Sequence, residues 1–489
     1  MKTFLMMPLV FLALGAPKAQ DADTSSQKTV PEQNEEFTKL KGTVDGLNEA
    51  FTETKNTVDK LAKLKIGGYA QVQWQHADSN NIGSVAGGNF PTTSNQRLQI
   101  RRGRLKATYD AGTSQYIAEF EMVPSGVSLK DAEIILVEPW LKSFTLGAGL
   151  MDRPFGFEVG YSSSAHETPE RSRMAQTLFP GEKDLGIKLE VNPAENMGFL
   201  KFFNLKAGLY TGTAGGVTAK NTVAFIPTKV AVRDSTLKLK SNKDSVIVNL
   251  PTGKTAPAAN GDEVDSTLDF ISRFGFKAPF ADLGLGIDGG VSIYYGNSLS
   301  GNDTVYTGTG AVSRGNKNKM FVREAYGADA QIFYDIPYLG GICLRGEYIQ
   351  GTMPGTVGNN KPYGTSGAAV AGDFPDSYMA NRSFNGFYVT LVQNLGSQFQ
   401  VVGRYDTFDP NTDVEGSDVG VGTATLGSQD LAYNTLGFGL VYWWDGNFKL
   451  TAYYDMVTNE EANFVNPKLA AWNHDLNDNV ITIRGQMKF

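Results

Sequence analysis

The chain has 489 residues and a net charge of −7, so it lacks the basic balance typical of nucleic-acid-binding proteins. Its one cysteine, Cys343, excludes an intrachain disulfide. With 55 glycines, 20 tyrosines and 29 phenylalanines, the composition favours β structure. The mean hydropathy of −0.24 also suits a transmembrane β-barrel, because only alternate residues of its strands meet lipid.

The first 34 residues predict a leader and a linker. Residues 1–20, "MKTFLMMPLVFLALGAPKAQ", place Lys2 before a short apolar run, the pattern of a secretory signal peptide. The alternative, a membrane anchor, needs about 20 apolar residues, and this run is shorter. Residues 21–34 are polar and predict a disordered linker. We therefore expect the protein to be exported.

Residues 35–65 show a heptad repeat of apolar side chains. One core position is occupied by Phe37, Val44, Phe51 and Val58, and the other by Leu40, Leu47, Thr54 and Leu61. Four consecutive heptads predict a coiled coil, which would be periplasmic in an exported barrel protein. The alternative is a single amphipathic helix that packs on its own domain.

Residues 66–489 alternate with a period of two. Sixteen such segments begin near Ile66, Leu98, Ser114, Leu129, Ser143, Lys183, Leu200, Ser266, Leu283, Phe321, Gly341, Phe384, Gln398, Tyr433, Asn447 and Asn479. Short turns follow the even-numbered segments, and long polar loops follow the odd-numbered ones, the longest being 212–265. An even strand number with loops sorted in this way predicts an all-β, 16-stranded antiparallel transmembrane β-barrel. A soluble sandwich or propeller is the alternative.

Charged residues fall on the inward parity of these strands, where sixteen strands would enclose an aqueous channel. Arg102, Arg104 and Lys106 on the second strand and Arg484 on the last would form a basic stripe on one wall. This stripe could steer small anions through the pore. The alternative is a salt-bridged wall, because carboxylates on the third strand lie beside the stripe.

The loop after the fifth strand, residues 152–184, is the second candidate site. Its charged residues include Arg153, Glu158, Glu170, Arg171 and Arg173. Long structured loops are often functional, so we expect this loop to fold into the pore and form its constriction. The alternative is an exposed outer loop.

Other signals are weak. Residues 409–418 place Asp409, Asn411, Asp413 and Glu415 at alternate positions, as a calcium loop would, but Val414 replaces the required glycine. A solvated acidic loop is the favoured interpretation. We find no catalytic constellation, and we expect no enzyme activity, no cofactor and no metal site.

Over about residues 97–213 the chain reads, in order, "RRGRLKATYD", "LKDAEIIL", "LGAGLMDRPFGFE", "ERS", "KDLGIKLE" and "GLYTG", followed by "DFISRFGFKAPF", "LRGEYIQG" and "RYDTFDPNTD". In content and order, these motifs resemble the phosphate-selective porin O and P family. The resemblance implies a trimeric, sixteen-stranded outer-membrane channel narrowed by its third loop. Anion-binding members carry arginine ladders and a lysine cluster at the constriction. This chain keeps Arg102 and Arg104 but has no lysine cluster in that loop.

These observations predict an outer-membrane porin of a Gram-negative cell, with a periplasmic arm. It would let small hydrophilic solutes diffuse passively and would favour anions such as phosphate. Its partners would be outer-membrane lipid and two further copies of the chain, although the heptad pattern alone suits a dimer. The alternative is an envelope-tethering barrel whose coiled-coil arm, bound to the cell wall, is the main functional element. No nucleic acid is expected.

Overall fold

The computed structural model describes residues 30–212, 267–300, 303–356, 379–421, 426–467 and 469–489. The expected signal peptide, the expected linker up to residue 29 and almost all of the long 212–265 loop lie outside these ranges. The chain divides between Ala62 and Lys63 into two compact units, which we describe separately.

The first unit contains one long helix, α1 (Val30–Ala62). It begins inside the expected linker and ends three residues before the expected end of the coiled coil. The apolar heptad side chains are 48–67% exposed, namely Phe37, Leu40, Val44, Leu47, Phe51, Val58 and Leu61. No helix among the described residues is long and apolar enough to cross a membrane.

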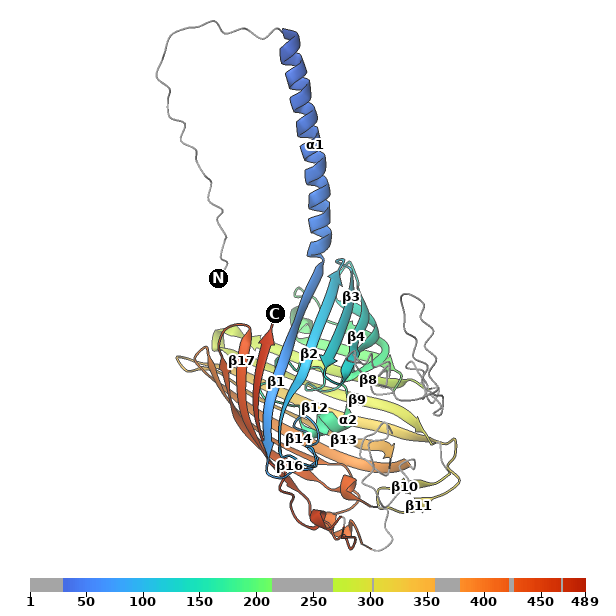
Figure 1. Ribbon diagram of the computed structural model, residues 1–489. Helices are drawn as coiled ribbons and strands as arrows, with labels where there is room; N and C mark the ends of the chain where they lie inside the picture. Colours follow the sequence, from blue (N-terminus) through green and yellow to red (C-terminus); the bar gives the residue numbers. More distant parts are fainter. Residues whose placement is uncertain (1–29, 213–266, 301–302, 357–378, 422–425, 468) are drawn as a thin grey trace, which may run out of the picture. The chain divides into compact units, whose positions relative to one another are not determined.

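The second unit is a closed antiparallel β-barrel, and its described part has sixteen wall strands (Figure 1). These are β1 (Leu64–Ala77), β2 (Gln96–Asp110), β3 (Ser114–Val123), β4 (Gly126–Val137), β5 (Phe144–Asp152), β6 (Lys183–Val191), β7 (Phe203–Tyr210), β8 (Asp269–Phe280), β9 (Leu285–Leu299), β12 (Met320–Ile336), β13 (Gly340–Thr356), β14 (Met379–Leu395), β15 (Phe399–Asp409), β16 (Tyr433–Trp443), β17 (Phe448–Asn459) and β18 (Val480–Lys488). The predicted fold class is confirmed.

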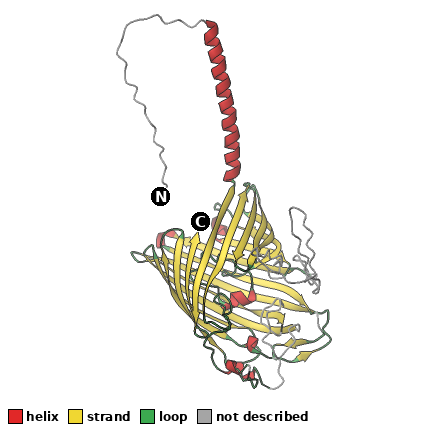
Figure 2. Cartoon of the chain, viewed as in Figure 1, coloured by secondary structure: helices red, strands yellow, loops and turns green. Residues whose placement is uncertain are grey.

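Short elements lie in the connections (Figure 2). They are α2 (Arg173–Leu178), β10 (Val305–Thr307), β11 (Val312–Ser313) and the 3-10 helices η1 (Gly198–Phe202), η2 (Ala281–Leu283), η3 (Gly416–Asp418), η4 (Ser428–Asp430) and η5 (Ala470–Asn473). The wall passes directly from β9 to β12, which pair over fifteen residues of β12. The β10–β11 hairpin therefore belongs to the connection between them.

The first and last strands close the barrel. They pair from Tyr69 and Lys488 to Ala77 and Val480. The ladder continues to the C-terminal residue, because Phe489 and Gly68 exchange backbone hydrogen bonds of 3.0 and 3.1 Å. Every wall strand thus has two neighbours, as a strand in hydrocarbon requires.

The connections are short at one end of the barrel and long at the other, with one exception. The longest described connection on the short-turn side is 192–202, whereas the other side carries 78–95, 410–432 and 460–479. The expectation of a long loop after every odd strand is wrong after β3, where only Pro124 and Ser125 intervene.

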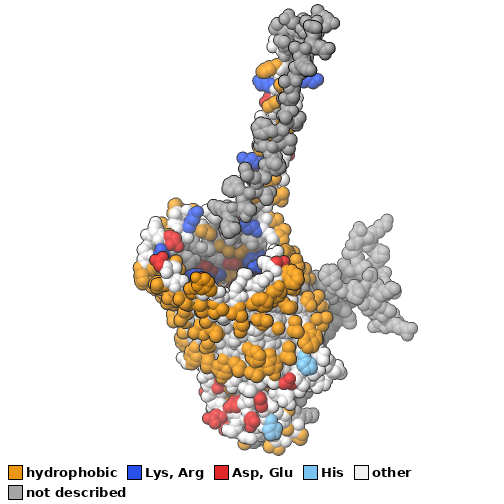
Figure 3. Space-filling view, turned by 90° about the vertical axis from the view of Figure 1, so that its left-hand side faces the viewer, with side chains coloured by type: hydrophobic (Ala, Val, Ile, Leu, Met, Phe, Trp, Pro, Cys, Tyr) orange, Lys and Arg blue, Asp and Glu red, His pale blue; other side chains and the backbone are white. Residues whose placement is uncertain are grey.

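Side chains alternate between a polar interior and an apolar outer face. On β18, Ile481 and Ile483 are exposed, whereas Thr482 and Arg484 are buried inside the barrel. Figure 3 shows hydrophobic side chains covering the outer wall and charged side chains around the hollow at one end. This distribution gives the wall one surface for lipid and one for water.

Candidate functional site

The loop between β5 and β6 lies inside the barrel. On one wall, the N–H of Gly156 donates to Ser292 Oγ of β9 at 2.9 Å. The carboxylate of Glu347 on β13 accepts from the N–H groups of Phe157 and Glu158 at 3.2 and 3.0 Å. These bonds fix the first part of the loop to one side of the lumen.

The same loop is also fixed to the opposite wall. Lys449 of β17 donates to the carbonyls of Ser164 and His166 at 3.0 and 2.8 Å. On β1, the hydroxyl of Tyr69 lies 2.6 Å from that of Ser163. Because its attachments lie on facing parts of the wall, the loop crosses the lumen.

Apolar packing holds the rest of the loop in place. A buried cluster joins loop side chains to inward side chains of the wall, and includes Phe155, Val159, Met174, Leu178, Phe179, Tyr210, Ile271, Tyr294, Ile349, Tyr388 and Phe408. The short helix α2 supplies two of these residues. Ser172 caps it by accepting from the N–H of Ala175 at 3.2 Å.

A carboxylate of the loop, Glu170, meets three arginines of the wall. Its oxygens accept from Arg101 at 2.8 and 3.0 Å, from Arg102 at 2.6 Å and from Arg484 at 2.6 Å. Burial alone would raise the pKa of Glu170, but Arg102, Arg101 and Arg484 together lower it well below its usual range. Glu170 is therefore ionised at neutral pH and neutralises part of the wall.

A β-bulge explains why two consecutive arginines face the lumen. Gln71 pairs with Arg102, but its neighbour Val72 pairs with Ile100, so Arg101 is the extra residue of β2. Strict alternation predicted Arg102 and missed Arg101. A similar shift between β3 and β4 leaves Lys130 as an extra inward cation, and it too was missed.

The remaining members of the predicted basic stripe differ in their surroundings. Arg104 pairs with Glu119 at 3.2 Å and with Glu121 at 3.0 Å. Lys106 forms no ion pair with the residues that the structure describes. The residues of the predicted stripe lie on β2 and β18, on either side of β1, and carboxylates compensate most of their charge.

The other charged loop residues mostly brace the loop itself. The guanidinium of Arg153 donates to the carbonyls of Pro180 and Glu182, at 3.2 and 3.3 Å. Arg171 donates to the carbonyl of Glu158 at 2.9 Å and pairs with the Glu182 carboxylate.

Glu158 also accepts from the backbone N–H of Ser172 at 2.9 Å, which ties the start of α2 to the first part of the loop. The guanidinium of Arg173, the first residue of α2, lies 3.8 Å from the ring centroid of Tyr433 on β16. Three of the predicted loop residues, Glu170, Arg171 and Arg173, line one cavity of about 620 Å³, which is described below.

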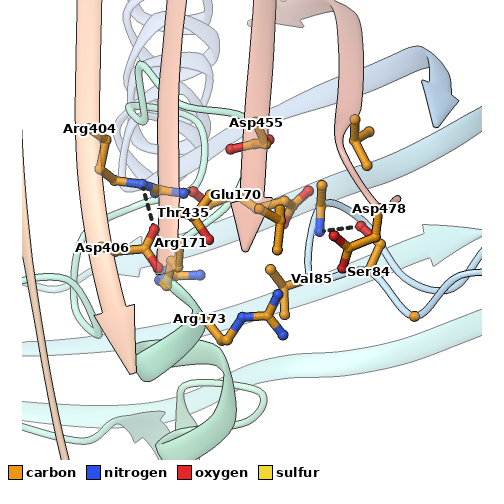
Figure 4. Close-up of a pocket in the computed structure, with 14 residues that line it drawn as sticks. Ser84, Val85, Glu170, Arg171, Arg173, Arg404, Asp406, Thr435, Asp455 and Asp478 are labelled. Atoms are coloured by element: carbon orange, nitrogen blue, oxygen red, sulfur yellow. Dashed lines mark hydrogen bonds and ion pairs between the residues drawn. The ribbon is translucent and has the colours of Figure 1, made fainter. Parts of the chain in front are cut away.

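The loop packs closely against β15 and β17 (Figure 4). Arg404 donates to the carbonyl of Glu170 at 2.7 Å and pairs with Asp406 at 3.2 Å. The space left beside Asp455 has a volume of about 10 Å³, which is about the size of one water molecule.

A larger cavity lies between the loop and strands β2, β3 and β4. It has a volume of about 620 Å³ and extends from the first outer loop toward the middle of the barrel. Six cations line it, namely Arg101, Arg102, Arg104, Lys130, Arg171 and Arg173, and three carboxylates, namely Glu121, Glu170 and Glu182. The lining is thus basic despite its ion pairs.

A second cavity, of about 520 Å³, lies on the short-turn side of the loop. Its wall residues come from strand segments near the short turns, for example Lys188 on β6 and Lys277 on β8. The loop therefore has a water-accessible space on each side.

The acidic segment 409–418 has no arrangement of metal ligands. Asn411 is buried and donates to the carbonyl of Gly308 at 2.7 Å and to Asp430 at 2.9 Å. Asp413 and Glu415 are exposed. Among the described residues, no three His, Cys, Asp or Glu side chains are placed to hold a metal ion.

Known proteins share the fold but not the sequence. No family model and no curated protein matches the chain. OprB of Pseudomonas putida superimposes with a TM-score of 0.53 at 9% identity, covering 89% of this chain and 96% of that one. The anion-selective porin of Comamonas acidovorans gives 0.46 at 12% identity, covering 87% and 99%. The outer membrane channel DcaP of Acinetobacter baumannii gives 0.46 at 10% identity, covering 87% and 97%. The chain has the barrel fold of outer-membrane porins.

Proposed function

We propose that this protein is an outer-membrane porin through which small hydrophilic solutes diffuse passively, with a preference for anions. The observation that carries the proposal is the basic cavity of about 620 Å³ beside the infolded loop. In this proposal the cavity continues past the loop as the solute passage, because the loop packs closely against β15 and β17. In this proposal the loop is the constriction, and its position sets the size limit for solutes.

The preference for anions follows from the charges at this passage. Its cations outnumber its carboxylates by six to three, which makes the local potential positive. Because Glu170, Glu121 and Glu182 pair with several of these cations, the preference is expected to be modest. Phosphate belongs to the proposed solutes through the sequence resemblance to the porin O and P family, although the loop lacks that family's lysine cluster.

The membrane setting follows from the same barrel. Its closed ladder and apolar outer face suit an outer membrane, and one OmpT structure from Vibrio cholerae with a similar fold is described as a trimer. We propose a homotrimer, in which the exposed heptad residues of α1 associate as a periplasmic coiled coil.

Planar-bilayer recording tests the channel. We expect stepwise conductance, a reversal potential in a KCl gradient that shows anion preference, and a smaller chloride current when phosphate is added. Cation preference would overturn the basic-passage argument. Absence of any conductance, for correctly folded protein, would overturn the porin itself.

A second candidate function rests on α1, whose apolar stripe is exposed. In that case the arm tethers the barrel to the cell wall, and transport is secondary. Deletion of residues 21–62, with the leader and the whole barrel unit kept, separates the two functions. Retained conductance together with loss of envelope integrity would favour the tether, whereas intact envelopes would remove its support.

A further inference from the structure

We propose that the cavity on the short-turn side of the loop binds organic anions that carry a flat carbon ring, such as aromatic carboxylates and sulfonates. The inference rests on the proposed channel function and names a class of solute for it. The cavity has a volume of about 520 Å³, within the range of sites for small organic ligands.

The loop provides an aromatic row along one side of this cavity. The ring centroids of Phe157 and Tyr161 lie 4.8 Å apart, and those of Tyr161 and His166 also lie 4.8 Å apart. Phe157 and Tyr161 line the cavity, and Phe157 is half-buried at the end of the row. The Arg345 guanidinium lies 5.7 Å from the ring centroid of Phe157, and the part of this residue that stays exposed is what a flat solute would contact.

Neighbouring interactions fix the row before any solute arrives. The Arg345 guanidinium lies 5.0 Å from the ring centroid of Tyr161 and pairs with Glu167. The Tyr161 hydroxyl donates to Glu167 at 3.3 Å. The backbone N–H of Phe157 is bound by Glu347. A preformed apolar surface of this kind loses little entropy when a ligand binds.

The strands provide cations on the other side. Lys206 and Lys277 line the cavity and have only loose partners, Glu190 at 3.8 Å and Asp288 at 3.9 Å. Their side chains are 40% and 73% exposed. Such weak, exposed pairs exchange readily with an incoming anion.

The two linings together select the proposed solute. Lysine ammonium groups attract the anionic head, and the ring of Phe157 contacts the flat body. A small inorganic anion would gain only the first contact, and a ring-bearing cation only the second. We therefore expect ring and negative charge to act together.

Current block tests the proposal with the full-length protein in planar bilayers. Benzenesulfonate and methanesulfonate have the same charge and differ in the ring. We expect benzenesulfonate to block at about tenfold lower concentration, the effect of one good ring contact. Phe157→Ala should remove most of this difference, and Phe157→Leu, which keeps an apolar side chain, should remove it without emptying the site. Lys277→Gln should weaken block by both sulfonates.

In the block experiment, two outcomes would overturn the proposal. One is equal block by the two sulfonates, and the other is an unchanged preference in Phe157→Leu. Phenyltrimethylammonium is the charge control and should not block. Binding of benzenesulfonate to detergent-solubilised protein, measured by NMR line broadening, separates this inference from the channel. Specific broadening without conductance would support the binding site and reject the channel. Conductance without broadening would support the channel and reject the binding site.

Discussion

Glu170 determines how much of the predicted basic stripe acts on a passing ion. It is bound by Arg101, Arg102 and Arg484 at 2.6–3.0 Å. The guanidinium groups of Arg101 and Arg102 thus both line the cavity of about 620 Å³ and hold the loop, whereas that of Arg484 only holds the loop. Because Glu170 comes from the loop and the three arginines come from the strands, this one carboxylate affects both the charge of the site and the position of the loop.

Replacing Glu170 tests this double role. In Glu170→Gln the three arginines lose their counter-charge, so the reversal potential should shift toward stronger anion preference. Breaking a buried ion pair usually costs about 3–5 kcal/mol, so the thermal unfolding temperature should also fall. Reversal potentials in a salt gradient and circular dichroism measure the two effects.

Glu195→Gln is the matched control, because it makes the same charge change on a side chain that is 93% exposed in the turn between β6 and β7. It should leave both measurements unchanged. An equal shift in selectivity for the two variants would show that net charge, rather than the passage, sets the preference.

The pH dependence of stability follows from the lowered pKa of Glu170. A carboxylate whose folded pKa lies below its unfolded value stabilises the fold fully above the unfolded value, and this contribution disappears as the pH falls through the folded pKa. The difference in unfolding temperature between the wild type and Glu170→Gln should therefore stay constant from about pH 8 to about pH 5. It should shrink in stronger acid. A difference that vanishes between neutral pH and about pH 5 would contradict the arginine contacts.

At the scale of one element, the seating of the loop depends on Gly156. Its φ is +59°, and a Cβ there would overlap the carboxylate of Glu347. The close approach allows Glu347 to accept from the N–H groups of Phe157 and Glu158. A side chain at this position is therefore strained by the backbone conformation, and it would force the Glu347 carboxylate to move.

Gly156→Ala should loosen the loop from β9 and β13. Strained backbone of this kind costs about 1–3 kcal/mol, so we expect a lower unfolding temperature and a larger, noisier single-channel conductance. Gly160→Ala is the control in the same loop, because no heavy atom lies within 4 Å of its added Cβ. If both variants conduct like the wild type, the loop does not set the width of the pore.

The strands were predictable and the contacts of the loop were not. A period of two over Ile481, Thr482, Ile483 and Arg484 reflects a wall with lipid on one side and water on the other, which a sequence records directly. The bulge at Arg101 depends on register with β1, and local alternation carries no signal of it beyond two adjacent charges.

The attachments of the β5–β6 loop to the wall could not be predicted from the sequence, for a related reason. Its charges indicated a site, but its attachments join residues far apart in the chain, such as Ser164 and Lys449. Such pairings depend on how the barrel closes. Strand periodicity implies closure, but it does not show which residues of neighbouring strands lie opposite each other. The sequence therefore identified Glu170 as a candidate without showing which cations it neutralises.

At the scale of the whole molecule, the question is how copies of the chain assemble. The barrel closes within one chain, since β1 pairs with β18. The helix α1 differs, because its apolar heptad residues are 48–67% exposed. Exposed a and d positions over four heptads are stable in water when other helices cover them. In the proposed trimer, the arm is an oligomer contact separate from the barrel wall.

Polar substitutions on this stripe should weaken the oligomer without affecting the barrel. In Leu40→Gln with Leu47→Gln, each copy loses two leucines that the proposed coiled coil would bury, so the oligomer should dissociate at lower temperature on heated SDS gels. Thr38→Gln with Thr52→Gln is the control, because these hydroxyls bond to their own helix and lie outside the core positions. Conductance of each remaining channel should stay the same, because the passage is built from one chain. Equal dissociation temperatures for the two double variants would mean that the barrel walls alone hold the copies together.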